Sequence, residues 1–177
     1  QQGNPELEIL VVDNASTDTT PTLDLQHPAV RVLRQPHNRG FAGGVNAGIR
    51  AARHPIVVVL NNDTRAASNL LIELHQALET DPRIGATAPV SNHVKGPAQL
   101  PVGSQGRDAE TRRAIADALG EARATSLQDV DTLAGLCLMM RRTTLAESGL
   151  FDERFGHGNF EDDDLCLRLR LLGYRLV

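Results

Sequence analysis

The chain has 177 residues, a size typical of one domain, and 41% of them are hydrophobic, which is enough to form a buried core. Its 18 lysines and arginines against 22 aspartates and glutamates give a net charge of −4, and its aromatic residues are four phenylalanines and one tyrosine. A negative charge and few aromatics argue against a nucleic-acid-binding protein, which relies on a basic surface or on base-stacking side chains.

The sequence indicates neither a membrane protein nor a metal-bound pair of cysteines. Its longest apolar run covers only residues 55–60, far short of the roughly 20 residues that a spanning helix requires. The first five residues lack the basic start and apolar middle of a signal peptide. We therefore expect a chain without a membrane span. Its expected location is the cytoplasm, where it could work at the inner face of the membrane. Cys137 and Cys166 lie among apolar residues and are expected to be buried, reduced thiols.

The first half of the chain alternates strand patterns with helix patterns. Strands are predicted at residues 7–12, 30–33, 56–60 and 84–90, and helices at 19–26, at 38–53 and after Ser68, up to the stop at Asp81. The run at 56–60 is apolar without alternation, as in a parallel strand covered on both faces. Polar clusters follow two of the strands, at 13–18 and 61–64. This order predicts an α/β fold with an open, mostly parallel sheet, helices on its faces and a ligand site at its carboxyl edge.

The second half has fewer regular patterns. Residues 91–106 are rich in Gly, Pro and Ser and are expected to form a long surface loop. Residues 107–124 form a charged helical pattern, which is either a solvated helix or a flap over an acceptor site. A buried strand is predicted within 131–141, a short helix up to about residue 148, and a final helix over 160–172 that Gly173 closes.

Two acidic places are expected near the carboxyl edge of the sheet. A hard divalent cation commonly takes one or two protein carboxylates plus substrate phosphates, so Asp63 is a candidate metal ligand, although it could equally be a turn residue. The four carboxylates at 161–164 either stabilise the positive, N-terminal end of a helix dipole or form a catalytic cluster. Within them, Asp162 is the candidate base, because an aspartate in the first turn of a helix is favoured in its ionised form.

Other polar residues are candidates for binding a nucleotide. Asp13, directly after the first strand, could accept hydrogen bonds from a nucleobase or a ribose, or could simply form a turn. Arg39 and the glycine-rich stretch 40–44 could contact phosphates. Of the six histidines, only His157 is expected near a site. The motifs GxxxxGK, GxGxxG and GxSxG are absent, which argues against common NTPases, dinucleotide enzymes and hydrolases.

Five segments, in order, resemble the motifs of glycosyltransferase family 2: VVDNASTD (11–18), NRGFAGGVNAG (38–48), LNNDT (60–64), GLFDERF (149–155) and FEDDDLCLR (160–168). The resemblance extends over nearly the whole chain, and residues 91–125 are the part it does not match. It implies a Rossmann-like GT-A fold, a nucleotide-sugar donor, inversion at the anomeric carbon and a divalent cation, Mn²⁺ or Mg²⁺.

The resemblance also implies roles for individual residues. Asp13 corresponds to the acid that contacts the nucleobase, and Asp63 to the metal-binding aspartate of the Asp-x-Asp motif, whose first aspartate is Asn61 here. Asp162 corresponds to the catalytic base, and Glu161 orients the site. The other residues expected to bind the nucleotide are Asn14, Asn38, Arg39, Gly40, Asn46 and Asn62.

The implied partners are a UDP-, dTDP- or GDP-sugar and a glycan or lipid-linked acceptor, in bacterial polysaccharide or cell-surface glycan synthesis. We expect one GT-A domain, with a nucleotide-binding half at about 1–90, a variable part at 91–125 and an acceptor part at 126–177. Measured against the family, the chain lacks the first strand and a C-terminal part, so we expect a core fragment. Two alternatives are an inactive nucleotide-binding core and a metal-dependent nucleotidyltransferase, which releases pyrophosphate.

Overall fold

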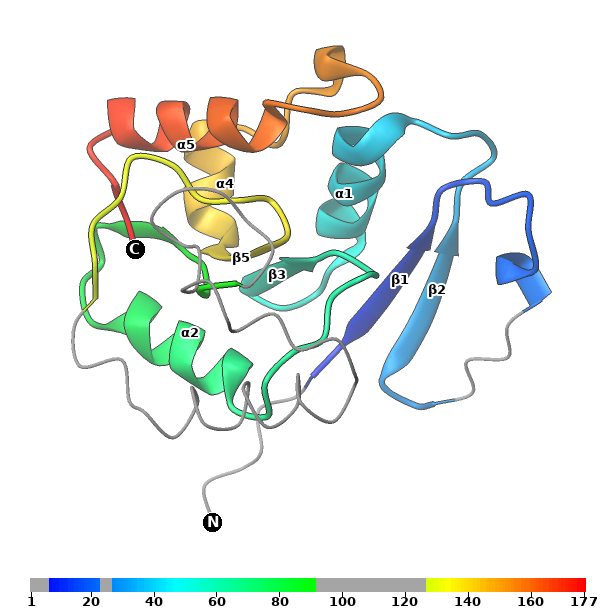
Figure 1. Cartoon of the computed structure of the whole chain (residues 1–177), viewed down its shortest axis with the longest axis horizontal. Helices are drawn as coiled ribbons and strands as arrows, with labels where there is room; N and C mark the ends of the chain where they lie inside the picture. Colours follow the sequence, from blue (N-terminus) through cyan, green and yellow to red (C-terminus); the bar gives the residue numbers. More distant parts are fainter. Residues whose placement is uncertain (1–6, 23–26, 92–126) are drawn as a thin grey trace.

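Short strands alternate with helices along most of the chain (Figure 1). The computed structural model describes residues 7–22, 27–91 and 127–177. In chain order the elements are β1 (Ile9–Asp13), η1 (Thr20–Thr22), β2 (Val30–Arg34), α1 (Gly40–Ala51), β3 (Ile56–Leu60), α2 (Leu70–Glu79), β4 (Ile84–Thr87), β5 (Cys137–Arg141), α4 (Arg142–Ser148), η2 (Glu153–Phe155), α5 (Glu161–Leu171) and β6 (Arg175–Leu176).

The described strands form two sheets. β1 and β2 pair in parallel, and the second sheet has the order β3-β5-β4-β6. The predicted α/β class with helices on the sheet is confirmed, but the sheet is mixed rather than mostly parallel, because β5 runs antiparallel to both β3 and β4. The antiparallel direction of β5 follows from its register: Leu60, at the end of β3, pairs with Cys137, at the start of β5, and Thr87, at the end of β4, pairs with Met139. β5 begins at the edge where β3 and β4 end, so it must run back between them.

The larger sheet separates two apolar cores. Alternate residues of β3 and β5 face opposite sides, as the two-residue period of a strand requires. One core joins the sheet to α1, α4 and α5, and the other joins it to α2. The strand residues on the first side are Val57, Val59, Leu138 and Met140, and those on the second side are Ile56, Val58, Cys137 and Met139.

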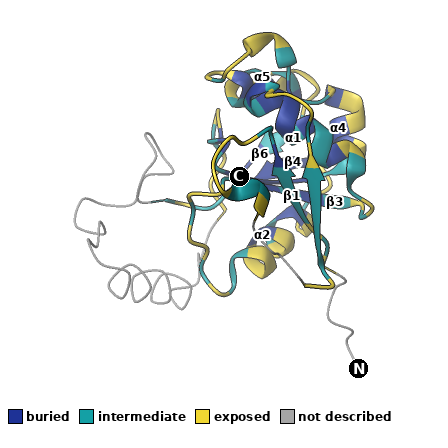
Figure 2. Ribbon diagram, turned by 90° about the vertical axis from the view of Figure 1, so that its right-hand side faces the viewer, coloured by how far each residue is buried: buried dark blue, intermediate teal, exposed yellow. Residues whose placement is uncertain are grey.

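The β1-β2 pair lies beside this sheet and is less buried. Figure 2 shows most of β1 in the intermediate class, and β2 has no buried residue. Asp13, at the end of β1, is the exception, with 6% exposure. Helix α1 packs closely on β1, since a Cβ on Gly48 would lie 3.1 Å from a methyl group of Val12.

Several predicted elements differ from the observed ones. The helix predicted at 19–26 is a single 3₁₀ turn at Thr20–Thr22, with residues 23–26 outside the described ranges. The strand within 131–141 is confined to Cys137–Arg141, and η2 and β6 were not predicted. The loop expected at 91–106, from residue 92 onward, and the helix expected at 107–124 lie outside the described residues.

Two expectations from composition can be compared with the structure. Both cysteines are free and buried, as predicted, and burial raises the pKa of each thiol to about 11. Within residues 7–22, 27–91 and 127–177, no helix is both long and apolar enough to cross a membrane.

Candidate active site

The loop after β1 is tied to the start of α1 by the side chain of Asn14. Its Nδ2 donates to Oδ1 of Asn38 (3.0 Å) and to the carbonyl oxygen of Gly40 (2.9 Å), and its Oδ1 accepts from the Arg39 amide (3.1 Å). The Gly40 amide in turn donates to Asn38 Oδ1 (2.8 Å). Four of the expected nucleotide-binding residues therefore form one hydrogen-bonded group at the carboxyl end of β1.

The carboxylate of Asp13 lies next to this group but is engaged by the chain itself. Oδ1 accepts from the Ser16 amide (2.9 Å), and Oδ2 forms an ion pair with Arg34 (2.8 Å). The hydrogen bonds from Ser16, and then those from Arg34, hold the pKa of Asp13 below its ordinary value. With 4% of its side chain exposed, Asp13 fixes the turn after β1 and the end of β2.

A second part of the site joins the turn after β3 to the start of α5. The Asn61 amide donates to the carbonyl oxygen of Leu136 (2.9 Å), and the neighbouring Gly135 amide donates to Oδ2 of Asp162 (2.8 Å). A Cβ on Gly135 would lie 3.2 Å from that same oxygen. Residues 135 and 136 thus connect the candidate metal turn to the candidate base.

The turn at 61–64 provides oxygen ligands but no complete metal cage. Asn62 and Asp63 are exposed, while Thr64 Oγ1 donates to the Asn61 carbonyl (2.6 Å) and closes the turn. In the part of the chain that the structure describes, no three His, Cys, Asp or Glu side chains are grouped to hold a metal ion. One exposed carboxylate fits a hard cation that takes its other ligands from water and substrate phosphates.

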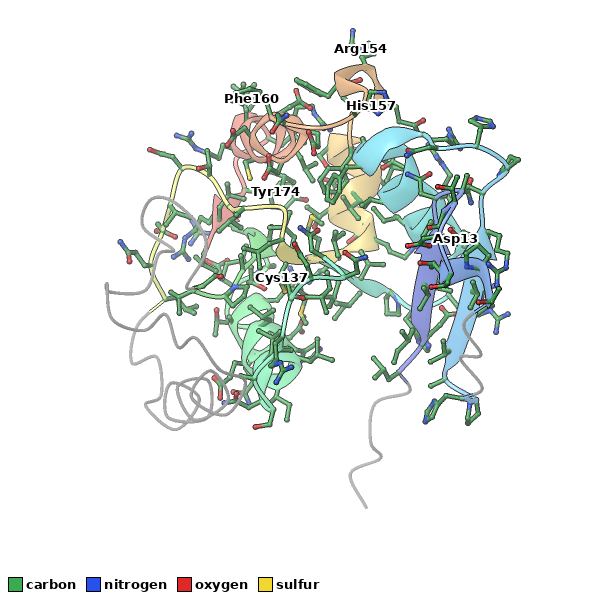
Figure 3. All side chains as sticks on the ribbon, turned by 45° about the vertical axis from the view of Figure 1, so that its right-hand side comes forward. Asp13, Cys137, Arg154, His157, Phe160 and Tyr174 are labelled. Carbon is green, nitrogen blue, oxygen red and sulfur yellow. The ribbon has the colours of Figure 1, made fainter. Side chains whose placement is uncertain are left out.

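The first turn of α5 carries four carboxylates, which match the positive end of the helix. Glu161 is 7% exposed, and among the described residues its Oε2 has no hydrogen-bond partner. The pKa of Asp163 is raised, first by desolvation and then by the charge of Asp162. Before the helix, Asn159 and Phe160 both have positive φ angles (83° and 71°), and Phe160 is 68% exposed (Figure 3).

Segment 151–157, which precedes α5, packs against the first turns of α1. Asn46 is 1% exposed, donates to the Phe151 carbonyl (2.8 Å) and accepts from the Phe151 amide (3.1 Å). Its Nδ2 also donates to Glu153 Oε1 (3.0 Å), and Arg39 pairs with Glu153 Oε2 (2.6 Å). Asn46 and the Arg39 guanidinium, both expected at the nucleotide, are therefore bonded to this segment.

Glu153 and Gly135 are among the residues of the site that the sequence analysis did not single out. Glu153 stands inside the GLFDERF motif, but nothing in its spacing indicates a partner in α1. Gly135 contributes only its backbone amide. His157, expected near a site, has its Cα 3.4 Å from where a Cβ of Gly40 would lie, beside the start of α1 (Figure 3).

Comparison with known sequences identifies relatives over most of the chain. The family described as Glycosyl transferase family 2 matches residues 1–147. An N-acetylglucosaminyl-diphospho-decaprenol L-rhamnosyltransferase of Mycobacterium tuberculosis is 30% identical over an alignment that covers 97% of this chain and 63% of the relative. The succinoglycan biosynthesis protein ExoO of Rhizobium meliloti is 36% identical over 49% of this chain and 24% of its own length. The chain thus spans less than two thirds of these relatives.

Solved structures resemble the fold. A mannosyltransferase of Pyrobaculum calidifontis, solved with GDP-Man and Mn²⁺, has a TM-score of 0.66 and 26% identity, covering 97% of this chain and 45% of that chain. GalNAc-T7, solved with UDP, GalNAc and Mn²⁺, has a TM-score of 0.71 at 16% identity, covering 97% of this chain and 35% of that chain. The GT-A fold expected from the sequence is therefore confirmed.

Proposed function

This chain belongs to glycosyl transferase family 2, and we propose that it transfers a sugar from a nucleoside-diphosphate sugar to an acceptor hydroxyl. The observation that carries the proposal is the hydrogen bond from Gly135 to Asp162, which holds a carboxylate beside the strand-end turn that contains Asp63. A base for the acceptor and a carboxylate near the donor diphosphate are the two groups that such a transfer uses.

In the proposed reaction, Asp162 takes the proton of the acceptor hydroxyl. The acceptor oxygen attacks the anomeric carbon while the bond from that carbon to the diphosphate breaks, so the configuration inverts and a nucleoside diphosphate leaves. The geometry suits a base, because amide groups of Gly135 and Asp163 donate to the two oxygens of Asp162 (2.8 and 3.0 Å) and fix its orientation. The buried Glu161, the first residue of α5, would orient the site.

For the donor, we propose binding along Asp13 and the neighbouring hydrogen-bonded residues Asn14, Asn38, Arg39 and Gly40, which we call the donor group, together with Asn62 and Asp63 in the turn after β3. Asp63 would hold Mn²⁺ or Mg²⁺ together with the donor's phosphates. The cation, when bound, would stabilise the charge that develops on the leaving diphosphate. The GDP-Man and Mn²⁺ with which the Pyrobaculum mannosyltransferase was solved support this choice of ligands.

For the acceptor, we propose a glycan or a lipid-linked glycan of bacterial surface polysaccharide synthesis. The mycobacterial relative is named for an acceptor in which N-acetylglucosamine is linked through a diphosphate to decaprenol, and the Rhizobium relative is named for succinoglycan synthesis. A lipid-linked acceptor would require the enzyme to work at the inner face of the membrane.

Calorimetric titration tests the donor site first. UDP, dTDP and GDP are titrated into the folded chain with and without Mn²⁺, and we expect one of them to bind in a Mn²⁺-dependent manner. Asp63→Ala should lose that dependence, whereas Asp131→Ala, at an exposed ion pair far along the sequence, should keep it. Absence of binding by a folded sample would contradict both the proposal and the alternative of an inactive nucleotide-binding core.

The matching nucleotide sugars then test the reaction. Release of a nucleoside diphosphate, with an inverted anomer identified by NMR of the product, is the expected result. Release of pyrophosphate from a nucleoside triphosphate would instead indicate a nucleotidyltransferase.

A further inference from the structure

Glu153 bonds to three side chains of the α1 region, although it is more than 100 residues away from each in the sequence. Its Oε2 pairs with Arg39 (2.6 Å), and its Oε1 accepts from Asn46 (3.0 Å) and from Arg50 (3.4 Å). The hydrogen bond from Asn46, followed by the contacts with Arg39, keeps the pKa of Glu153 below its ordinary value. We call these four residues the Glu153 cluster.

The backbone next to Glu153 is fitted to α1 as well. Phe151 is 2% exposed and packs edge to face on Phe41, with ring centroids 6.0 Å apart. On the other side of Glu153, a Cβ on Gly40 would collide with the carbonyl oxygen of Gly156. Segment 151–156 therefore lies on α1 with no space between them at Gly40.

The chain between this contact and Asp162 is a run of backbone conformations that favour glycine. Gly156, Gly158, Asn159 and Phe160 all have positive φ angles, and three of the four are exposed. The body of α5 is anchored separately, because Arg168 donates to the Leu150 carbonyl (3.0 Å) and to Asp164 (2.8 Å). The contacts of segment 151–156 with α1 thus fix the N-terminal end of the stretch that leads to the first turn of α5, while the Gly135 amide holds Asp162 at the other end.

We propose that Glu153 is a positioning residue of the transfer reaction: it holds the segment leading to Asp162 against the residues that bind the donor. The inference rests on the proposed function and deepens it. Glu153 forms an ion pair with the side chain of Arg39, and the Arg39 amide donates a hydrogen bond to Asn14. The residues proposed to bind the donor are therefore linked to the segment that leads to Asp162. Binding of a nucleotide at the donor group then also orders residues 154–160.

The effects of charge and of shape can be separated at this position. Glu153→Ala removes the bonds from Glu153 to Arg39, Asn46 and Arg50 and keeps those between Asn46 and the Phe151 backbone. Glu153→Gln keeps an acceptor oxygen for Asn46 but presents an amide group to Arg39, so it should restore part of the order. Glu147→Ala is the matched control, because Glu147 is an exposed glutamate on α4 that accepts a hydrogen bond from Tyr174 (2.7 Å).

Hydrogen–deuterium exchange of the full chain tests the positioning directly, without any transfer assay. In Glu153→Ala, we expect amides of residues 154–160 to exchange about tenfold faster or more, because a charged hydrogen-bond partner is lost. Amides within 165–171 should keep their rates and serve as an internal reference. Glu153→Gln should give intermediate rates, and Glu147→Ala rates like those of the unchanged chain.

The same measurement with Mn²⁺ and the nucleotide found by calorimetry tests the connection. Nucleotide should slow exchange at 154–160 in the unchanged chain but not in Glu153→Ala. If a sugar donor is transferred, turnover in Glu153→Ala should fall about a hundredfold, with nucleotide affinity changed less than tenfold, as expected for a misplaced base.

Two results would overturn the inference. One is unchanged exchange at 154–160 in Glu153→Ala, and the other is a nucleotide effect on these amides that persists without Glu153. Failure of every nucleotide to bind would contradict the proposed function instead, while the comparison of exchange rates in the free protein would still decide whether Glu153 positions the segment.

Discussion

The Gly135 amide donates a 2.8 Å hydrogen bond to Oδ2 of Asp162, and no side chain at position 135 comes between them. This contact brings a carboxylate at the start of α5 to the loop that precedes β5. The next residue along that loop, Leu136, accepts a hydrogen bond from the Asn61 amide. One short stretch of backbone is therefore bonded both to the turn that contains Asp63 and to Asp162 at the start of α5.

Substitution Asp162→Asn should abolish sugar transfer and leave nucleotide binding intact. A positioned base contributes on the order of 10² to 10⁴ in rate, which sets the expected loss. An amide has one oxygen for the two N–H donors of Gly135 and Asp163, so we also expect a stability loss of about 1 kcal/mol, measured by urea unfolding. Asp163→Asn is the control, and transfer at an unchanged rate by Asp162→Asn would refute the assignment.

Gly40→Ala should lower the free energy of unfolding by more than the cost of placing an alanine at a positive φ angle. Gly40 has φ 71°, and its added methyl group would also collide with the Gly156 carbonyl. Gly173→Ala is matched to it, because Gly173 has φ 87° but no atom of the described residues within 4 Å of the position that a Cβ would take. The control should lose roughly 1–2 kcal/mol, the cost of a left-handed residue with a side chain. Equal losses in the two variants, by urea unfolding, would contradict the close packing of Gly156 on α1.

Asn46→Ala should destabilise the fold by about 2 kcal/mol or more, since it leaves the buried amide and carbonyl of Phe151 without their partners. Asn62→Ala, in an exposed turn, should change stability by less than about 0.5 kcal/mol. Unfolding at equilibrium in urea measures both. A small effect of Asn46→Ala would mean that the contact between α1 and Phe151 contributes little to stability.

The sequence predicted well those features that depend on neighbouring residues. Helices α1 and α2 were predicted to within a few residues, because apolar spacing and the stop at Asp81 are local signals. The direction of β5 was not predictable, because a buried apolar run looks the same in a parallel and an antiparallel strand. β6, with two residues, is too short to leave a pattern.

For the candidate site, the limits of sequence reasoning have a similar cause. The polar residues 13, 14 and 38–40 were expected at one edge, and Asn14 does join them there. The partners of Asn46 were not foreseeable, because its bonds go to Phe151 and Glu153, more than 100 positions along the chain. A contact between distant segments is set by the packing of α1 on the chain before α5, which no local pattern records.

Acid should reveal the contribution of Asp13 to stability. The bonds from Ser16 and Arg34 lower its folded-state pKa, so the ionised carboxylate stabilises the folded protein above the unfolded value of about 3.9. That contribution is lost as the pH falls through the lower, folded-state pKa. Asp13→Asn should therefore reduce the free energy of unfolding clearly at pH 7 and by a smaller amount at a pH below about 3.9. Asp131→Asn, at an exposed ion pair, should have a small effect at both pH values, and an Asp13→Asn effect that grows as the pH falls would contradict the ion pair with Arg34.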